Sequence, residues 1–312
     1  MKAVTLDRIE AFTPGRAWTI DEVAEESGLS RHQARMFRRI RGMATVRSDP
    51  DLALLDLLAA PAETLLAGVS DVDSVRYLIY SHTFPDLTPS YVNAPELLRN
   101  RLGLKKADAF AVAQQACASG LAAIDVAGEL LRADGDPSAK ALVLTGEKPF
   151  TGLTRYLVHV SIMGEASSAC LVGLDGGGSR VVSYANRTEG EFAAGFRMTP
   201  DTQRRFGESY NDHLLDQMES ALDQAGLRMS DIAMVVPHNV NLSSWLKLCT
   251  RVGFDRRRVF LDNLAEFGHC YCSDPFLNLV SMRERNLLAK GELYMLTSVG
   301  VGSTYAAMVI EY

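Results

Sequence analysis

The sequence QQACASG at residues 114–120 lies between two patterns that together indicate the fold. The apolar run AFAVA (109–113) before it is typical of a buried strand, and LAAIDVAGELLRA (121–133) after it has the spacing of a helix. Cys117 therefore stands where a strand passes into a helix. A cysteine in that place is either a small buried hydrophobe or a reactive thiol.

The position of Cys117 favours a reactive thiol. The first backbone N–H groups of a helix have no intrahelical partner, and together with the helix dipole they favour a thiolate. Alanine, serine and glycine flank the cysteine, so a thioester has room to approach. The Cys117 amide and an amide of the loop near Gly300 and Gly302 could stabilise the oxyanion of a thioester reaction. The alternative is a structural cysteine at a close helix–strand contact.

Strands and helices alternate along the first half of the chain. The predicted strands cover 75–80, 108–116, 139–148 and 167–175, and the predicted helices cover 51–69, 93–103 and 118–133. Such alternation predicts an α/β protein whose parallel or mixed sheet is covered on both faces.

The second half repeats the outline of the first. Residues 231–239 (DIAMVVPHN) follow the pattern of VRYLIYSHT, a strand and then a loop with a histidine. Residues 292–300 and 303–312 likewise follow the patterns of ALVLTGEK and SSACLVGLD. We therefore expect two related halves, 1–175 with the nucleophile and 176–312 with His238, joined near the glycine-rich turn LDGGGSR.

Composition excludes several classes of protein. The chain has 312 residues, 47% of them hydrophobic, and a formal net charge of -6, which argues against general nucleic-acid binding. No apolar run has the length of a membrane span, and the N-terminus lacks the apolar core of a signal peptide. Five cysteines in a chain of this length fit a reducing cytoplasm better than a disulfide framework. We expect a cytoplasmic protein with no membrane or nucleic-acid partner.

Six segments in order resemble those of a known family. They are GLSRHQARMFRRIRGMATVR, QQACASG, IMGEASSACLV, VVPHNVN, EFGHCYCSDPFLNL and SVGVGSTYAAMVIEY. Together they are similar to the thiolase-fold condensing enzymes, specifically the β-ketoacyl-acyl-carrier-protein synthase III type. The resemblance implies a five-layered αβαβα fold, a homodimer, and acyl transfer from coenzyme A or an acyl-carrier protein without a separate cofactor. It also implies a catalytic cysteine, histidine and asparagine.

The third catalytic position departs from the family pattern. Cys117 and His238 match the family's cysteine and histidine, but His269 stands where the family has asparagine, and Asp274 follows it. Decarboxylative condensation needs two neutral donors for an enolate, whereas transfer to a hydroxyl or amine needs a base. A carboxylate beside a histidine supplies such a base. Some relatives in secondary metabolism form esters or amides, and the Gly-His…Asp pattern resembles theirs.

We therefore expect an acyltransferase that carries its acyl group on Cys117. His238 is the expected acid and base, with His269 or Asp274 as helper, and transfer to oxygen or nitrogen is favoured. The alternative is decarboxylative condensation with malonyl thioester in fatty-acid or polyketide biosynthesis, in which a neutral His269 would donate to the enolate. Asp274 could also simply cap the helix that begins at Pro275.

Residues around the substrate are less well defined by the sequence. Asn241 either binds substrate or caps the following helix. The segments 81–92 and 150–160, with Phe84 and Phe150, are expected to shape the acyl pocket. The family's tryptophan–arginine clamp for coenzyme A is missing. Five basic residues could form a rim for an acidic carrier protein, although a solvated face is the more common meaning of such a run: Lys247, Arg251, Arg256, Arg257 and Arg258.

Two readings from other classes are weaker. HCYC at 269–272 resembles part of a metal site, but it has no second ligand pair at a matching spacing. TIDEVAEESGLSRHQARMFRRIRG (19–42) resembles a helix-turn-helix, which makes a DNA-binding regulator a remote alternative. A catalytically inactive partner subunit is a third possibility, which the retained Cys117 and His238 oppose.

Overall fold

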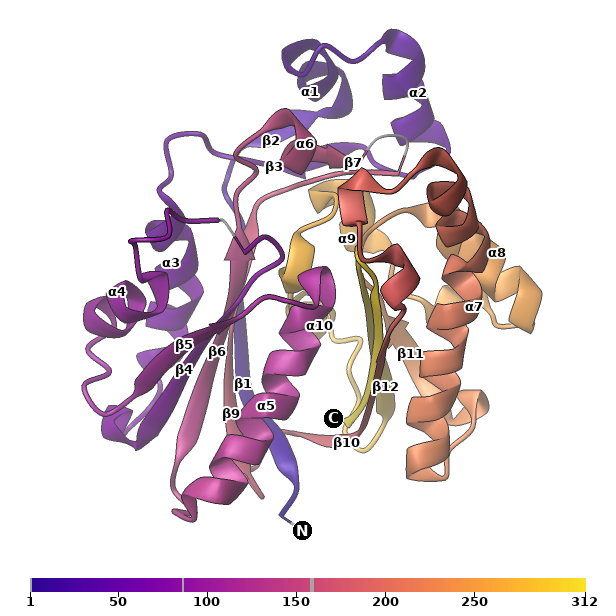
Figure 1. Ribbon diagram of the computed structural model, residues 1–312. Helices are drawn as coiled ribbons and strands as arrows, with labels where there is room; N and C mark the ends of the chain where they lie inside the picture. The colour runs from indigo at the N-terminus through magenta and orange to yellow at the C-terminus, as the bar shows by residue number, and fades with distance from the viewer. Residues whose placement is uncertain (1, 86, 158–159) are drawn as a thin grey trace.

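The computed structural model describes residues 2–85, 87–157 and 160–312, and nine strands form one mixed sheet (Figure 1). In sheet order these are β11 (Ile232–Val236), β12 (Leu293–Gly300), β13 (Thr304–Glu311), β10 (Ser179–Thr188), β1 (Val4–Phe12), β9 (Ala166–Leu174), β6 (Lys140–Glu147), β4 (Val75–Ser81) and β5 (Asp108–Val112). The β1–β10 junction is narrow, because only Thr5–Arg180 and Leu6–Ser179 pair across it. The sheet therefore consists of two parts joined at one seam.

The two parts of the sheet have the same strand order and directions. β4 is parallel to β6, β6 antiparallel to β9, and β9 antiparallel to β1. β11, β12, β13 and β10 repeat these three relations in the same order. A bridge between Val235 and Val259 lies where β5 pairs with β4 in the first part. The internal repeat read from the strand patterns is thus present in the topology, while the division at residue 175 stays a prediction.

Helices separate and cover the two parts of the sheet, giving five layers (Figure 1). α3 (Leu54–Leu66) and α4 (Ala94–Arg101) cover one outer face, and α7 (Pro200–Ala225) and α8 (Leu242–Val252) cover the other. Between the two parts lie α5 (Ser119–Asp134) and α10 (Asp274–Glu284). The predicted αβαβα layering is confirmed.

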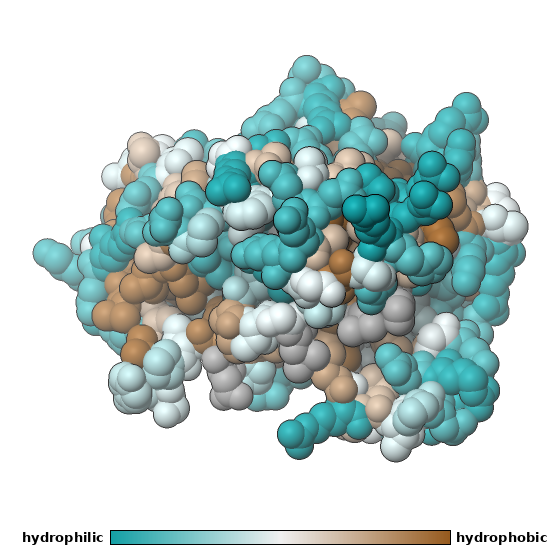
Figure 2. Space-filling view, turned by 90° about the horizontal axis from the view of Figure 1, so that it is seen from above, coloured by the Kyte–Doolittle hydropathy of each residue, from teal (hydrophilic) through white to brown (hydrophobic). Residues whose placement is uncertain are grey.

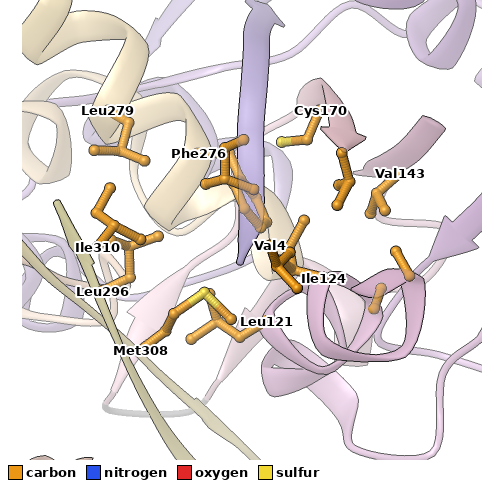
Figure 3. Close-up of a cluster of buried hydrophobic side chains, with 14 of the residues drawn as sticks. Val4, Leu121, Ile124, Val143, Cys170, Phe276, Leu279, Leu296, Met308 and Ile310 are labelled. Carbon is orange, nitrogen blue, oxygen red and sulfur yellow. The ribbon is translucent and has the colours of Figure 1, made fainter. Parts of the chain in front are cut away.

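The middle layer carries a core shared by both halves. Its buried cluster joins Ile124 of α5 and Phe276 of α10 to Val143 of β6 and to Leu296 and Met308 of β12 and β13 (Figure 3). All five side chains are fully buried. Neither half could bury these faces alone, so the hydrophobic effect couples them.

A small subdomain projects from the end of the sheet near α6 (Gly152–Arg155) (Figure 1). It contains β2 (Ala17–Thr19), α1 (Ile20–Glu26), α2 (Arg31–Arg39) and β3 (Thr45–Arg47). Thr19 and Ser30 form capping boxes at the two helix starts. Ala34 and Phe37 of α2 point into a core that includes Leu264 of α9 (Asp262–Phe267). The apolar face of α2 is therefore used for packing within the chain.

Strands β1 and β10 and helix α7 were not identified from the sequence. β1 contains Asp7, Arg8 and Glu10 among apolar residues, which obscures its strand pattern. The fold neutralises these charges, since Lys140 pairs with Asp7 at 2.6 Å and Arg8 with Glu10 at 3.1 Å. The remaining short strands are β7 (Tyr156–Leu157) and β8 (Ser161–Ile162). Within the described ranges, no helix combines the length and apolar character needed to cross a membrane.

Candidate active site

Cys117 lies in a 3₁₀ turn (Ala116–Ala118) that leads directly into α5. The turn is shaped by the end of β12. Ser298 Oγ donates to the Cys117 carbonyl at 2.8 Å, and a Cβ at Gly300 would lie 2.0 Å from the Gln115 carbonyl oxygen. Ala116 is held at a φ of 48°, a left-handed conformation rare for a residue with a Cβ. The second half of the chain thus fixes the turn that presents Cys117.

Three predicted site residues form a continuous chain of contacts. Cys117 Sγ lies 3.4 Å from His269 Nε2, and His269 Nδ1 lies 2.5 Å from Asp274 Oδ2. All three side chains are buried. Such a cysteine–histidine–carboxylate arrangement can activate a nucleophile and move its proton.

Asp274 is oriented toward His269 by two backbone donors outside its own helix. The amides of Asn239 and Cys270 donate to its carboxylate at 2.6 and 2.7 Å. Asp274 is the first residue of α10, yet its carboxylate bonds to these neighbours and to His269. The Asp274 carboxylate therefore binds His269 and two backbone amides and does not act as a helix cap.

The protonation of His269 follows from its two partners. Burial disfavours the charged imidazole, but Asp274 and the Cys117 sulfur outweigh burial and raise the pKa of His269 to about 10. His269 is consequently an imidazolium near neutral pH. This charge lies beside the Cys117 sulfur, which is 3.4 Å from His269 Nε2.

His238 occupies a different environment from the one expected. Its Nε2 lies 2.6 Å from the Tyr210 hydroxyl, and its carbonyl accepts from Trp245 Nε1 at 3.4 Å. Burial and the nearby His269 lower the pKa of His238 to about 3, so it is neutral. The His238 and His269 rings are 6.3 Å apart. Of these two histidines, His269 makes the described hydrogen bond to the Cys117 sulfur, whereas from the sequence we expected His238 to have the main proton-transfer role.

Cys117 also borders a second polar group, which the sequence did not predict. Thr83 Oγ1 lies 3.5 Å from Cys117 Sγ, and 3.5 Å from Cys272 Sγ. Glu147 is fully buried and accepts the backbone amides of Thr83 and Phe84. Burial raises the pKa of Glu147 to about 7, against the opposing effect of its bonds from Thr83. An acidic residue at the end of the apolar run ALVLTGE was the signal that could have indicated it.

A cavity of about 400 Å³ borders Cys117 and is mainly apolar. Phe84 lines it and lies against the rings of Phe196 and Phe150 at 5.8 and 5.9 Å. The lining also includes Arg197. From the end of the molecule that carries α1 and α2, hydrophobic residues are visible between hydrophilic ones (Figure 2). A larger cavity of about 690 Å³ lies beside β1 and shares none of these lining residues.

The expected pocket segments are partly placed at this cavity. Its lining includes residues 83–85 of segment 81–92, and Thr154 and Leu157 of segment 150–160. Phe150 is half exposed and reaches the site through its contact with Phe84. Residues 86, 158 and 159 of the two segments lie outside the described residues.

The contacts described for the remaining predicted residues do not involve the Cys117 sulfur. Asn241 is buried and caps α8, accepting from the Ser244 amide at 2.9 Å. Gly302 follows the end of β12, with a φ of 125°. In the expected basic rim, Arg251 pairs with Asp212, and Arg257 with Asp255.

The HCYC segment is used for protein contacts. Cys270 Sγ lies 3.7 Å from the Phe267 carbonyl, and Cys272 Sγ lies 3.3 Å from the Ala116 carbonyl. Across residues 2–85, 87–157 and 160–312, no group of three or more histidine, cysteine or acidic residues is arranged to hold a metal ion.

Sequence comparison with known proteins finds similarity over much of the chain. Residues 222–312 match the family model described as 3-oxoacyl-[acyl-carrier-protein] synthase III C terminal. The β-ketoacyl-[acyl-carrier-protein] synthase III of Cereibacter sphaeroides is 24% identical over 276 residues, 82% of this chain and 83% of the relative. That of Roseiflexus castenholzii is 37% identical over 92 residues, 30% of this chain and 28% of the relative.

Solved structures extend this similarity to the complete fold. The acyltransferase ChlB3 superposes with a TM-score of 0.87 at 18% identity, over 99% of this chain and 97% of its own. The synthase III of Aquifex aeolicus gives 0.84 at 17% identity, over 99% and 100% of the two chains. OleA of Xanthomonas campestris gives 0.82 at 17% identity, over 100% and 98%. These likenesses confirm the predicted thiolase-like fold.

Proposed function

Because the chain is a thiolase-fold protein of the β-ketoacyl-acyl-carrier-protein synthase III type, we propose that it is an acyltransferase that works through Cys117. Its acyl group would pass from a thioester donor to the Cys117 sulfur and then to a hydroxyl or amine. The observation that carries this proposal is the contact chain from Cys117 through His269 to Asp274.

In the first step the Cys117 sulfur attacks the carbonyl carbon of the donor thioester. The new carbon–sulfur bond replaces the bond to the donor's sulfur, which leaves as a thiol after taking the proton of the His269 imidazolium. Asp274 supports this imidazolium before transfer and fixes the ring's orientation. Thioesters of coenzyme A and of acyl-carrier protein are the proposed donors, and the names of the curated relatives include the acyl-carrier protein.

In the second step the neutral His269 takes a proton from the acceptor. The acceptor oxygen or nitrogen bonds to the acyl carbon, the bond to Cys117 breaks, and the sulfur leaves as a thiolate beside the restored imidazolium. The pair returns to its starting state without a net change in protons. When the cysteine is acylated and neutral, Asp274 still raises the pKa of His269, so Nε2 can act as the base for the acceptor proton.

The other site residues support this chemistry by position. We propose that the Cys117 amide and the backbone near Gly300 and Gly302 stabilise the tetrahedral oxyanion. Phe84 would line the acyl pocket with Phe196, and Phe150 would pack behind Phe84.

A second candidate is decarboxylative condensation of the acyl group with a malonyl thioester. It is favoured by the curated relatives, which are named β-ketoacyl-[acyl-carrier-protein] synthase III. Against it stands the charged His269 in the place where a neutral amide donor was expected from the family pattern.

Intact-protein mass spectrometry tests the common step. The protein is mixed with acyl-coenzyme A and with acyl-carrier donors, and we expect an acyl adduct that disappears in Cys117→Ala. An adduct that survives in Cys117→Ala, or its absence with every donor, would reject the proposal. The acylated protein is then offered malonyl thioester, and formation of a β-ketoacyl product with release of carbon dioxide would select the second candidate.

A further inference from the structure

Tyr210 of α7 bonds directly to His238. Its hydroxyl lies 2.6 Å from His238 Nε2. The Tyr210 ring makes edge-to-face contacts with the rings of Phe206 and Tyr305, at 5.7 and 6.0 Å. Trp245 also packs against His238, with ring centres 6.1 Å apart. The packing therefore fixes both members of the tyrosine–histidine pair.

The protonation of this pair determines what His238 can donate. Burial and the charge of His269 keep His238 neutral, and burial raises the pKa of Tyr210 well above its usual value, so its phenol keeps its proton. A neutral imidazole has one donor nitrogen and one acceptor nitrogen. When the phenol donates to Nε2, the imidazole proton is on Nδ1, and Nε2 has no proton to offer a substrate.

This arrangement bears on carbon–carbon bond formation. Loss of carbon dioxide from a malonyl thioester leaves an enolate, whose oxygen must be stabilised by hydrogen-bond donors before a proton or an acyl carbon reaches its carbon. His269 is committed to Cys117 and Asp274, and His238 Nε2 is committed to Tyr210. Both histidines of the site are thus engaged with protein groups.

We propose that Tyr210 is the residue that suppresses decarboxylation, by holding His238 in the tautomer that cannot donate from Nε2. Tyr210 acts as a positioning residue, and the inference rests on the proposed acyl transfer through Cys117. On this proposal, the Tyr210 hydroxyl on α7 partly determines whether the site carries out acyl transfer or decarboxylative condensation. Tyr210 lies outside the sequence motifs that carry Cys117, His238 and His269.

The test compares the parent protein with Tyr210→Phe and a matched control, Tyr305→Phe. Tyr305 is buried and packs on Tyr210, so its substitution removes a neighbouring hydroxyl while leaving the bond to His238. Each protein is given malonyl-coenzyme A, and the acetyl thioester and carbon dioxide formed are measured. We expect Tyr210→Phe to raise decarboxylation about tenfold or more, because one donor is worth at least that factor, and Tyr305→Phe to leave it at the parent rate.

Equal decarboxylation in Tyr210→Phe and the parent would overturn the proposal. The amount of acyl-Cys117 formed by each protein is recorded in parallel, so that failure of acylation in the parent rejects the proposed function instead. A second measurement needs no variant. ¹⁵N NMR of histidine-labelled parent protein should show His238 protonated at Nδ1, and protonation at Nε2 would contradict the proposal even if Tyr210→Phe does not fold.

Discussion

At the scale of the residue, Asp274 determines what His269 can do. Its carboxylate contacts the histidine on the side away from the sulfur and receives two backbone amides that fix its direction. A neutral side chain of the same shape would keep the contact but remove the charge that supports the imidazolium. Such a substitution should therefore slow the reaction of Cys117 while leaving the fold intact.

We expect Asp274→Asn to slow acylation of Cys117 by about 10²–10⁴-fold, as loss of the carboxylate does in comparable triads. Rapid quenching followed by mass spectrometry measures the rate of adduct formation. Asp262→Asn is the control, because Asp262 is a surface residue paired with Arg285. Acylation of Asp274→Asn at the parent rate would show that the contact chain has no role in activation.

The pH dependence of stability should also report on His269. Its pKa rises from an ordinary 6.5 to about 10 in the fold, so the native state binds the proton more tightly than the unfolded chain. The resulting stabilisation is complete below pH 6.5 and is lost as the pH rises through 10. Urea denaturation measures the free energy of unfolding of the parent and of His269→Asn. As the pH rises over this range, the parent should lose stability relative to His269→Asn. A difference that is constant with pH would contradict the raised pKa.

At the scale of the element, Asn241 begins α8. It accepts the Ser244 amide at 2.9 Å and is almost fully buried. We expect Asn241→Ala to lower the free energy of unfolding by about 0.5–2 kcal/mol and Asn241→Ser to recover most of it, since serine also caps helices. Urea denaturation measures the change. Loss of acylation without loss of stability would instead favour the substrate-binding role considered from the sequence.

The turn that carries Cys117 depends on the absence of a side chain at Gly300. A Cβ there would meet the backbone oxygen of Gln115 and the Cβ of Ala116, and a backbone atom cannot move aside easily. We expect Gly300→Ala to destabilise the fold by about 1–3 kcal/mol and to slow acylation by displacing the turn. Gly190→Ala is the matched control, because its Cβ would meet open space. Similar thermal stability and acylation rates for both variants would disprove the steric coupling.

At the scale of the whole molecule, the middle layer makes the two halves one folding unit. Phe276 lies in the core that α5 and α10 share with strands of both sheet parts (Figure 3). Removal of such a ring leaves a cavity that both halves line. Stability should therefore be lost from the entire chain at once.

We expect Phe276→Ala to cost about 3–5 kcal/mol and to leave a single unfolding transition at a lower denaturant concentration. Circular dichroism and tryptophan fluorescence, followed in parallel, measure whether the halves unfold together. Leu287→Ala is the control, because Leu287 is 42% exposed. Two separated transitions in the parent would refute the shared core.

Local sequence was sufficient for much of the fold. The apolar runs of β4, β6, β9 and β11 to β13 are buried strands because continuous hydrophobicity needs cover on both faces, and their repeated order indicated two related halves. Cys117 was recognisable because a strand, a small-residue turn and a helix follow one another directly. Asn241 as a cap also follows from neighbours within the same segment.

Only the tertiary structure decided which histidine contacts the sulfur. Cys117 and His269 are 152 residues apart, and their contact depends on how α10 packs between the two sheet parts. Tyr210, Thr83 and Glu147 come from three further segments, so no local pattern placed them at the site. The sequence determined that a thiol is presented at a helix start, because that is a property of neighbouring residues. The partners of the thiol were decided by long-range packing, because hydrogen bonds reach only a few ångströms and sequence separation carries no information about that distance.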